Sequence, residues 1–148
     1  MKALVQRVAE AEVRIDGARH DAIGAGLLIF LGVGRADIEK DAAYLASRCA
    51  DLRIFEDEAG KMDRSLKEIK GKALVISQFT LCADTRKGNR PSFLDAAPPD
   101  AARLLYLSFL GALKSEIGGE AVHAGVFGAM MDIHLINRGP VTISIDSK

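Results

Sequence analysis

Two short apolar runs constrain the fold of this chain more than any other feature. Residues 27–33 read LLIFLGV, and residues 73–81 read ALVISQFTL. Apolar runs of this length between glycine and polar breaks are typical of buried strands, and the first is expected to be central. A length of 148 residues suits one domain with a real core, so we expect a single domain over residues 1–148.

The other strand patterns alternate between apolar and polar residues. Residues 3–15 alternate in part, and Asp16-Gly17 is a strong hairpin turn pair that returns the chain through residues 18–24. Near the C-terminus the residues N-R-G-P, 137–140, interrupt two further alternating stretches. We expect late strands at residues 121–127, 130–136 and 141–146.

Two segments have helical periodicity. Asp37 can cap a helix whose apolar residues recur every three or four positions as far as Leu52. Pro98-Pro99-Asp100 can open a second helix that runs to Ile117. Residues 56–71 are polar and are expected to form a loop. The predicted fold class is mixed α/β, with mainly antiparallel strands and two main helices.

Charge and composition exclude several classes of function. Acidic and basic residues balance at 20 each, whereas proteins that coat duplex nucleic acid are usually strongly basic. We therefore expect no DNA partner, although a local basic patch is compatible with this balance. No stretch approaches the roughly 18 apolar residues of a membrane span, and the first residues do not resemble a signal peptide. The expected compartment is the cytoplasm, with no membrane partner.

The usual catalytic groups are scattered. The three histidines, His20, His123 and His134, form no close pair, and two cysteines offer no metal-binding spacing. We expect no metal and no cofactor. Ser77 is not in a Gly-x-Ser-x-Gly turn, and the glycines around residues 24–34 bracket a strand and do not precede a helix. Judged locally, Ser77 and Thr80 can be strand hydroxyls or nucleophiles, and the pattern favours strand hydroxyls.

The segment SQFTLCADTRKGNRPSF, residues 77–93, places hydroxyls and an amide beside a basic loop. It contains no histidine and no glutamate that would act as a general base. The cations Arg86, Lys87 and Arg90 can hold a phosphate, or they can form an ordinary solvated loop.

The segment INRGPVT places Gly139 before Pro140 between two alternating stretches. The pair can be a plain turn. Because cis peptides occur mostly before proline, it can also be a rigid backbone wedge that contacts a ligand without side chains.

Taken together, these motifs resemble the D-aminoacyl-tRNA deacylase family over essentially the whole chain. The resemblance rests on VQRV, LRIFEDEAGKM, SQFTL, ADTRKGNRPSF and GVFGAMMDIHLINRGPVT. It implies the fold of that family and a homodimer with its active site at the subunit interface. It also implies a hydrolase that releases D-amino acids, and glycine, from aminoacyl-tRNA and so acts in proofreading during translation. A cis Gly139-Pro140 peptide would reach into the neighbouring subunit's pocket and reject L-amino acids.

The resemblance also assigns catalytic residues within SQFTL, which Ser77 opens. Backbone N–H groups near Phe79 and Thr80, and the Gln78 amide, are candidate donors to a developing oxyanion. Thr80 is the family's older nucleophile candidate. We favour a positioning role for it, because no base is visible and the ribose 2′-hydroxyl of the substrate can assist water.

Further positions match the family's pattern outside SQFTL. Arg7 corresponds to an arginine that secures the neighbouring Gly-Pro loop, Phe127 and Met131 to pocket walls, and Ala102 to a small lining residue. Arg86, Lys87 and Arg90 would meet phosphates of the tRNA acceptor end. Two departures stand out: Arg138 where Asp is frequent, and Cys82 where Tyr is common.

Three rival interpretations remain open. A tRNA acceptor-end binding module without turnover would use the same basic loop, but it would be expected to lose SQFTL or Gly-Pro, and both are intact. A general ester or peptide hydrolase would need an activated nucleophile. A purely structural dimer module explains neither motif.

Overall fold

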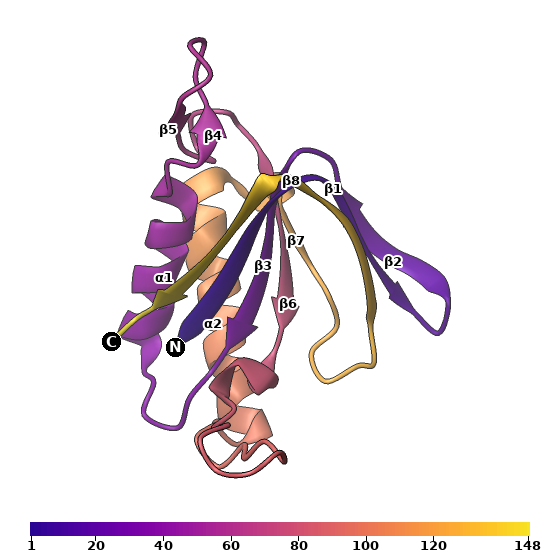
Figure 1. The fold of residues 1–148 in the computed structure, drawn as a ribbon, viewed down its shortest axis with the longest axis vertical. Helices are drawn as coiled ribbons and strands as arrows, with labels where there is room; N and C mark the ends of the chain where they lie inside the picture. The colour runs from indigo at the N-terminus through magenta and orange to yellow at the C-terminus, as the bar shows by residue number, and fades with distance from the viewer.

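The computed structural model describes all residues from 1 to 148 and shows a curved sheet with two helices (Figure 1). The elements, in chain order, are β1 (Lys2–Ile15), β2 (Ala18–Ile23), β3 (Gly26–Gly32), α1 (Glu39–Asp51), β4 (Phe55–Glu56), β5 (Met62–Arg64), β6 (Lys72–Ser77), the 3-10 turn η1 (Phe79–Cys82), α2 (Pro99–Ile117), the 3-10 turn η2 (Gly119–Ala121), β7 (Val122–Ala124) and β8 (Asp132–Asp146).

The run at 27–33 forms a central strand of the main sheet, as predicted, and the first part of the run at 73–81 forms the buried strand beside it. The strand order is β2-β1-β3-β6-β7, and β8 pairs with β1. Strand β1 pairs antiparallel with β2, β3 and β8, whereas β3–β6 and β6–β7 are parallel. The sheet is therefore mainly antiparallel, and the predicted mixed α/β class is confirmed.

The hairpin between β1 and β2 turns at Asp16 and Gly17. Both residues have positive φ, 51° and 78°, which is the backbone that two-residue hairpin turns require and that Asp-Gly adopts at low cost. The predicted turn is confirmed.

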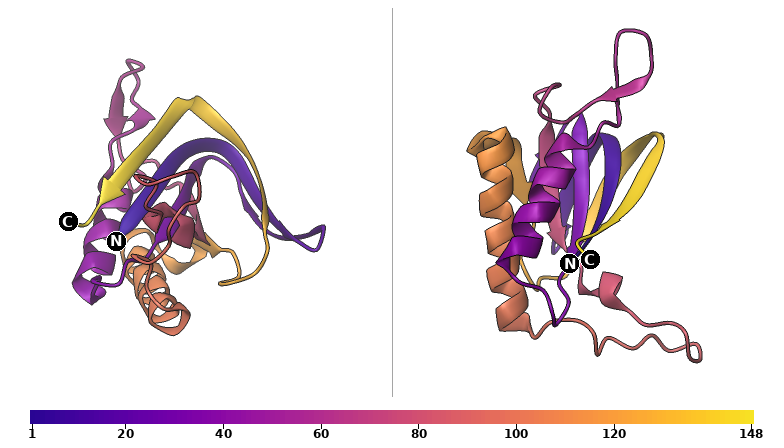
Figure 2. Two further views of the ribbon diagram at one scale, coloured as in Figure 1. Left: turned by 60° about the horizontal axis from the view of Figure 1, so that its bottom comes forward. Right: turned by 90° about the vertical axis from the view of Figure 1, so that its left-hand side faces the viewer.

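Each face of the sheet has its own core. Helices α1 and α2 lie side by side against one face (Figure 2). A cluster of 21 buried residues, including Leu27, Ile29 and Phe109, fills the space between. A smaller cluster of seven, including Leu28 and Leu74, lies on the opposite face. Because β3 is buried on both faces, its sequence is continuously apolar and does not alternate. Neither helix is long and apolar enough to cross a membrane.

The predicted strand at residues 73–81 is too long. Strand β6 ends at Ser77, because its partner β3 ends at Gly32 and offers no further ladder. The Gln78 N–H still donates to the Leu31 carbonyl at 2.8 Å, and the chain then turns into η1, where the Leu81 N–H donates back to the Gln78 carbonyl at 3.3 Å. Thr80 is therefore a turn residue and not a strand hydroxyl.

The late strands also differ from the prediction. The two expected strands at 130–136 and 141–146 are one strand, β8, which bends at N-R-G-P and stays paired with β1 through irregular register near Arg7. The stretch predicted as strand 121–127 keeps only β7, because β6 pairs with it over just three residues.

Two smaller expectations are wrong as well. Ile38, not Asp37, precedes α1, and its N–H donates to the Asp41 carboxylate at 2.9 Å. The Asp37 carboxylate instead accepts from the Gly34 N–H at 2.6 Å. The expected loop 56–71 contains part of a short hairpin, β4–β5, that projects from the body (Figures 1 and 2). Helix α2 begins and ends as expected, and Gly118, with φ of 91°, follows it.

Candidate active site

The SQFTL motif forms the turn at the end of β6. Thr80 is exposed, and its hydroxyl accepts a hydrogen bond from the Gln78 amide at 2.5 Å. No carboxylate or imidazole hydrogen-bonds to Thr80 in the chain. A threonine hydroxyl without a neighbouring base is a weak nucleophile. The geometry fits a hydroxyl that positions a reactant.

The same turn leaves backbone donors unused. The N–H groups of Phe79 and Thr80 donate to no acceptor in the chain, because they begin η1 and precede its first internal bond. Unpaired N–H groups at the start of a helical turn point outward and can stabilise negative charge. Residues 78–80 therefore present two main-chain donors beside a side-chain amide.

An exposed aromatic pair links this turn to the loop that follows it. The ring of Phe79 is 56% exposed and meets the ring of Phe93 edge to face, with centroids 5.1 Å apart. Between them, Asp84 and Ser92 exchange backbone hydrogen bonds of 2.8 and 2.9 Å. These bonds join the two ends of the basic loop, which contains Arg86, Lys87 and Arg90.

The three loop cations are not equivalent. The Arg86 guanidinium binds the Asp84 carboxylate through Nε and Nη2, at 2.9 and 2.7 Å. This contact holds the pKa of Asp84 well below its usual range. Lys87 and Arg90 form no ion pair within the chain. The loop therefore offers two uncompensated cations and a third already neutralised by its neighbour.

The predicted wall residues lie on both sides of the end of β6. Phe127 packs on Tyr106 with ring centroids 5.7 Å apart, and the Tyr106 hydroxyl donates to the Val75 carbonyl at 3.0 Å. On the other side, a Cβ added at Gly125 would meet Met131 Sδ at 2.6 Å and Ile76 Cδ1 at 3.0 Å. Ala102 is buried in the same cluster as Tyr106, one turn earlier on α2.

The Gly-Pro motif lies in the bend of β8. The peptide bond between Gly139 and Pro140 is cis, as the resemblance implies, and both residues are exposed. Arg7 is only 7% exposed. Its Nε donates to the Arg138 carbonyl at 3.0 Å and its Nη1 to the Ile54 carbonyl at 2.6 Å. Arg7 thus holds the Gly-Pro bend of its own chain.

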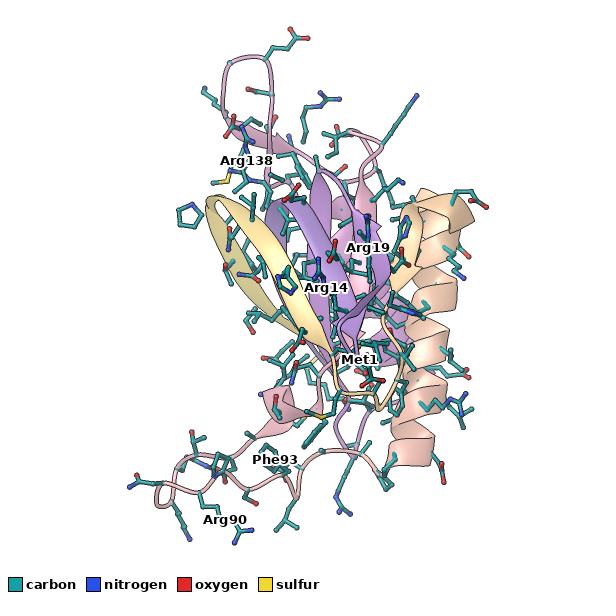
Figure 3. All side chains as sticks on the ribbon, turned by 90° about the vertical axis from the view of Figure 1, so that its right-hand side faces the viewer. Met1, Arg14, Arg19, Arg90, Phe93 and Arg138 are labelled. Carbon is teal, nitrogen blue, oxygen red and sulfur yellow. The ribbon has the colours of Figure 1, made fainter.

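The two motifs lie at opposite ends of the sheet. The bend is level with Arg7, which pairs with Leu27, and Leu27 pairs with Ala73 at the start of β6. Gln78 is five residues further along. With about 3.3 Å per residue and 4.8 Å per strand, the separation is about 20 Å. Figure 3 shows Arg138 at one end and Arg90 and Phe93 at the other.

The structure also identifies residues that the sequence did not single out. Phe93 and Asp84 belong to the motif quoted for its hydroxyls and cations. The spacing of two residues between Asp84 and Arg86 could have indicated their pairing, whereas no spacing indicates that Phe93 contacts Phe79. Ile54 and Glu56 join the Gly-Pro bend through Arg7. Both lie in the segment LRIFEDEAGKM that was quoted for the family resemblance, but nothing in the sequence placed them near the Gly-Pro motif.

Comparison with known proteins places this chain in one family. The family model described as D-Tyr-tRNA(Tyr) deacylase matches residues 4–146. A D-aminoacyl-tRNA deacylase of Anaeromyxobacter dehalogenans is 55% identical over 100% of this chain and 98% of its own length. One of Thermus aquaticus is 53% identical over 99% of this chain and 95% of its own.

Two solved structures share the fold. A structure described as c-Myc DNA unwinding element binding protein matches with a TM-score of 0.96 and 40% identity, over 100% of this chain and 99% of its own. A probable eukaryotic D-amino acid tRNA deacylase matches with a TM-score of 0.86 at 16% identity, over 98% of each chain.

The chain is a small mixed α/β protein of the aminoacyl-tRNA deacylase class. It belongs to the D-aminoacyl-tRNA deacylase family, and the predicted resemblance is confirmed.

Proposed function

We propose that this chain is a chiral editing hydrolase that cleaves the ester between a D-amino acid, or glycine, and the terminal ribose of tRNA. The observation that carries the proposal is the SQFTL turn, which offers free N–H groups at Phe79 and Thr80 and no general base. An aminoacyl ester is already activated, so it needs a placed water and oxyanion donors more than it needs a strong base.

The reaction follows from these groups. Water adds to the ester carbonyl, and the oxygen that becomes negative accepts from the two backbone N–H groups. The carbon–oxygen bond to the ribose then breaks, and the ribose oxygen takes a proton. The ribose 2′-hydroxyl can relay that proton from the attacking water, while Thr80 and the Gln78 amide hold the reactants in place. The products are free tRNA and the free amino acid.

Chirality would come from a second copy of the chain. Gly139-Pro140 and Thr80 are about 20 Å apart in one chain, so a site that uses both needs a homodimer in which each bend reaches the partner's turn. Rigid backbone there would occupy the space of an L side chain, while carbonyls of the motif hold the α-amino group. Glycine has no Cβ to exclude, so its ester would be cleaved as well.

The tRNA would be held by its acceptor end. Lys87 and Arg90 are free to meet phosphates, whereas Arg86 is already paired with Asp84. We expect Lys87→Ala and Arg90→Ala each to weaken tRNA binding and to reduce its salt dependence by about one phosphate contact, and Arg86→Ala to do so less. Because aminoacylated tRNA is used by ribosomes in the cytoplasm, we expect the protein to act there.

A second function has one observation in its favour, since the 40% identical structure is named for binding a DNA element. The zero net charge of this chain speaks against duplex binding. A non-catalytic tRNA-binding module is the other alternative. Both predict binding without hydrolysis.

The test compares matched D-tyrosyl-, L-tyrosyl-, glycyl- and L-alanyl-tRNA under single turnover, with binding to deacylated tRNA and to duplex DNA measured alongside. Cleavage of the D-tyrosyl and glycyl esters alone supports the proposal. Binding without any cleavage would favour a module, and equal treatment of glycyl- and L-alanyl-tRNA would contradict the steric account.

A further inference from the structure

The Arg7 guanidinium divides its nitrogens among three parts of the chain. Nε holds the Arg138 carbonyl in the bend of β8, and Nη1 holds the Ile54 carbonyl just before β4. Nη2 lies 3.6 Å from Glu56 Oε1 in β4. Glu56 is the one carboxylate within ion-pair distance of this buried cation.

The nitrogen that faces Glu56 also lies against Gly139. A Cβ at Gly139 would stand 2.5 Å from Arg7 Nη2, so the guanidinium occupies the side of the glycine where any other residue would place its side chain. A rotation of Arg7 about its Nε would therefore move this contact directly. Hydrogen bonds to carbonyls hold the other two nitrogens, and the third has the carboxylate of Glu56 as its one partner, at ion-pair and not hydrogen-bond distance.

The charge of Glu56 matters because Arg7 is buried. A buried guanidinium that is bound only by neutral carbonyls keeps an uncompensated charge, which is costly in a medium of low dielectric constant. Glu56 supplies the counter-charge from the edge of the site, where its own side chain is 60% exposed. Water screens the pair, so its effect will be modest.

We propose that Glu56 is a positioning residue that acts through Arg7 and sets the orientation of the Gly139-Pro140 bend. The β4–β5 hairpin, which carries Glu56, then supports the Gly139-Pro140 bend that excludes L-amino acids. This inference rests on the proposed function for its effect on selectivity, but its effect on the bend is independent of any activity.

The test compares Glu56→Gln with Glu58→Gln in the full-length protein. Glu58 lies on the same hairpin, is exposed and has no ion-pair partner, so it controls for charge and hairpin stability. The structural readout is hydrogen exchange of the Val141 amide, which donates to Asn137 Oδ1 at 2.9 Å within the bend. The functional readout is the ratio of D-tyrosyl- to L-tyrosyl-tRNA hydrolysis.

For Glu56→Gln we expect the Val141 amide to exchange about two- to fivefold faster and the D/L ratio to fall by a similar factor, as suits a partly exposed ion pair. Glu58→Gln should change neither. Equal behaviour of the two variants in both readouts would overturn the inference. If wild type cleaves no D-ester, the proposed function fails, and the exchange of Val141 alone still decides the role of Glu56.

Discussion

The two ends of the sheet are built in opposite ways. At the Thr80 end, the chain leaves β6 in an exposed turn in which the N–H groups of Phe79 and Thr80 are unpaired, and an exposed aromatic pair and a charged loop lie beside it. At the other end, the Gly139-Pro140 bend is also exposed, but the buried Arg7 donates to the Arg138 carbonyl in the bend, and Arg7 is itself held by the Ile54 carbonyl and faces the Glu56 carboxylate.

Under the proposed function, this difference corresponds to two separate tasks. Donors for a developing charge must be free until the substrate arrives, so the turn cannot satisfy them internally. A surface that excludes L-amino acids by steric clash must be rigid, so the bend needs a rigid support. The comparison predicts that substitutions at the bend will cost stability, and that substitutions at the turn will cost activity with little change in stability.

The largest effect is expected for Arg7→Ala. The substitution leaves the Ile54 and Arg138 carbonyls without their donor and opens space beneath the bend, so the free energy of unfolding should fall by about 2–4 kcal/mol. Arg14→Ala, on the same strand but exposed, should change it by less than about 0.5 kcal/mol. Urea unfolding of both variants measures the difference. Similar losses of unfolding free energy in the two variants would contradict the supporting role of Arg7.

Gly139→Ala should come next. Gly139 has φ of 124°, and a Cβ there would clash with Arg7 Nη2, so we expect a loss of about 1–3 kcal/mol. Gly111→Ala in α2 is the matched control, because it meets nothing within 4 Å and should stabilise by about 0.5–1 kcal/mol. Opposite shifts in Tm support the account, and shifts of the same sign contradict it.

Tyr106→Phe tests the support beneath the Thr80 end. The hydroxyl is bound to the Val75 carbonyl, so its loss should cost about 1 kcal/mol at pH 7. Burial raises the pKa of Tyr106 to about 12, above the value near 10 of an unfolded chain.

The pH dependence of this cost has a definite sign. A raised folded-state pKa means that the unfolded chain ionises first, so the wild type loses stability as pH rises from about 10 to 12. The phenylalanine variant lacks this loss. We expect the difference in the free energy of unfolding between wild type and Tyr106→Phe to shrink above pH 10, as measured by chemical denaturation. A difference that stays constant up to about pH 11.5 would be inconsistent with a buried hydroxyl.

The smallest effect on stability is expected for Thr80→Ala. Thr80 is exposed and accepts one hydrogen bond from Gln78, so the free energy of unfolding should change by less than about 0.5 kcal/mol. If Thr80 positions the reactants, the single-turnover rate should fall less than about tenfold, whereas loss of a nucleophile typically costs a factor of about 10³ or more. A tRNA ending in 2′-deoxyadenosine should then lose more rate than the variant does.

Patterns of apolar residues predicted most of the fold. The runs at 27–33 and 73–81 identified the two central strands, and Asp16-Gly17 identified the hairpin, because each depends on local chemistry. The ends of elements were predicted less well. The length of β6 depends on where its partner β3 ends, and the continuity of β8 depends on pairing with β1. Neither is a local property.

The candidate site was predicted through family motifs more than through physics. Local reasoning left Thr80 as a strand hydroxyl and left the Gly-Pro motif as either a turn or a wedge. The contact of Gln78 with Thr80 is local but needs the turn that follows the end of β6. The contacts of Arg7 with Arg138 and Ile54 join residues far apart in the sequence, so they depend on the tertiary fold. The pairing of Arg86 with Asp84, which lowers its value for phosphate binding, was open to prediction from a spacing of two residues.

The central claim is that one active site combines the Thr80 turn of one copy with the Gly139-Pro140 bend of another. Thr80→Arg and Pro140→Arg each place a bulky cation at an exposed position, so each homodimer should fold and lose D-tyrosyl-tRNA hydrolysis. In mixed dimers, verified by native mass spectrometry, one site receives an intact turn from one chain and an intact bend from the other. We predict that mixing restores up to about half of the wild-type rate per mixed dimer. Mixed dimers that form but remain inactive would contradict the account.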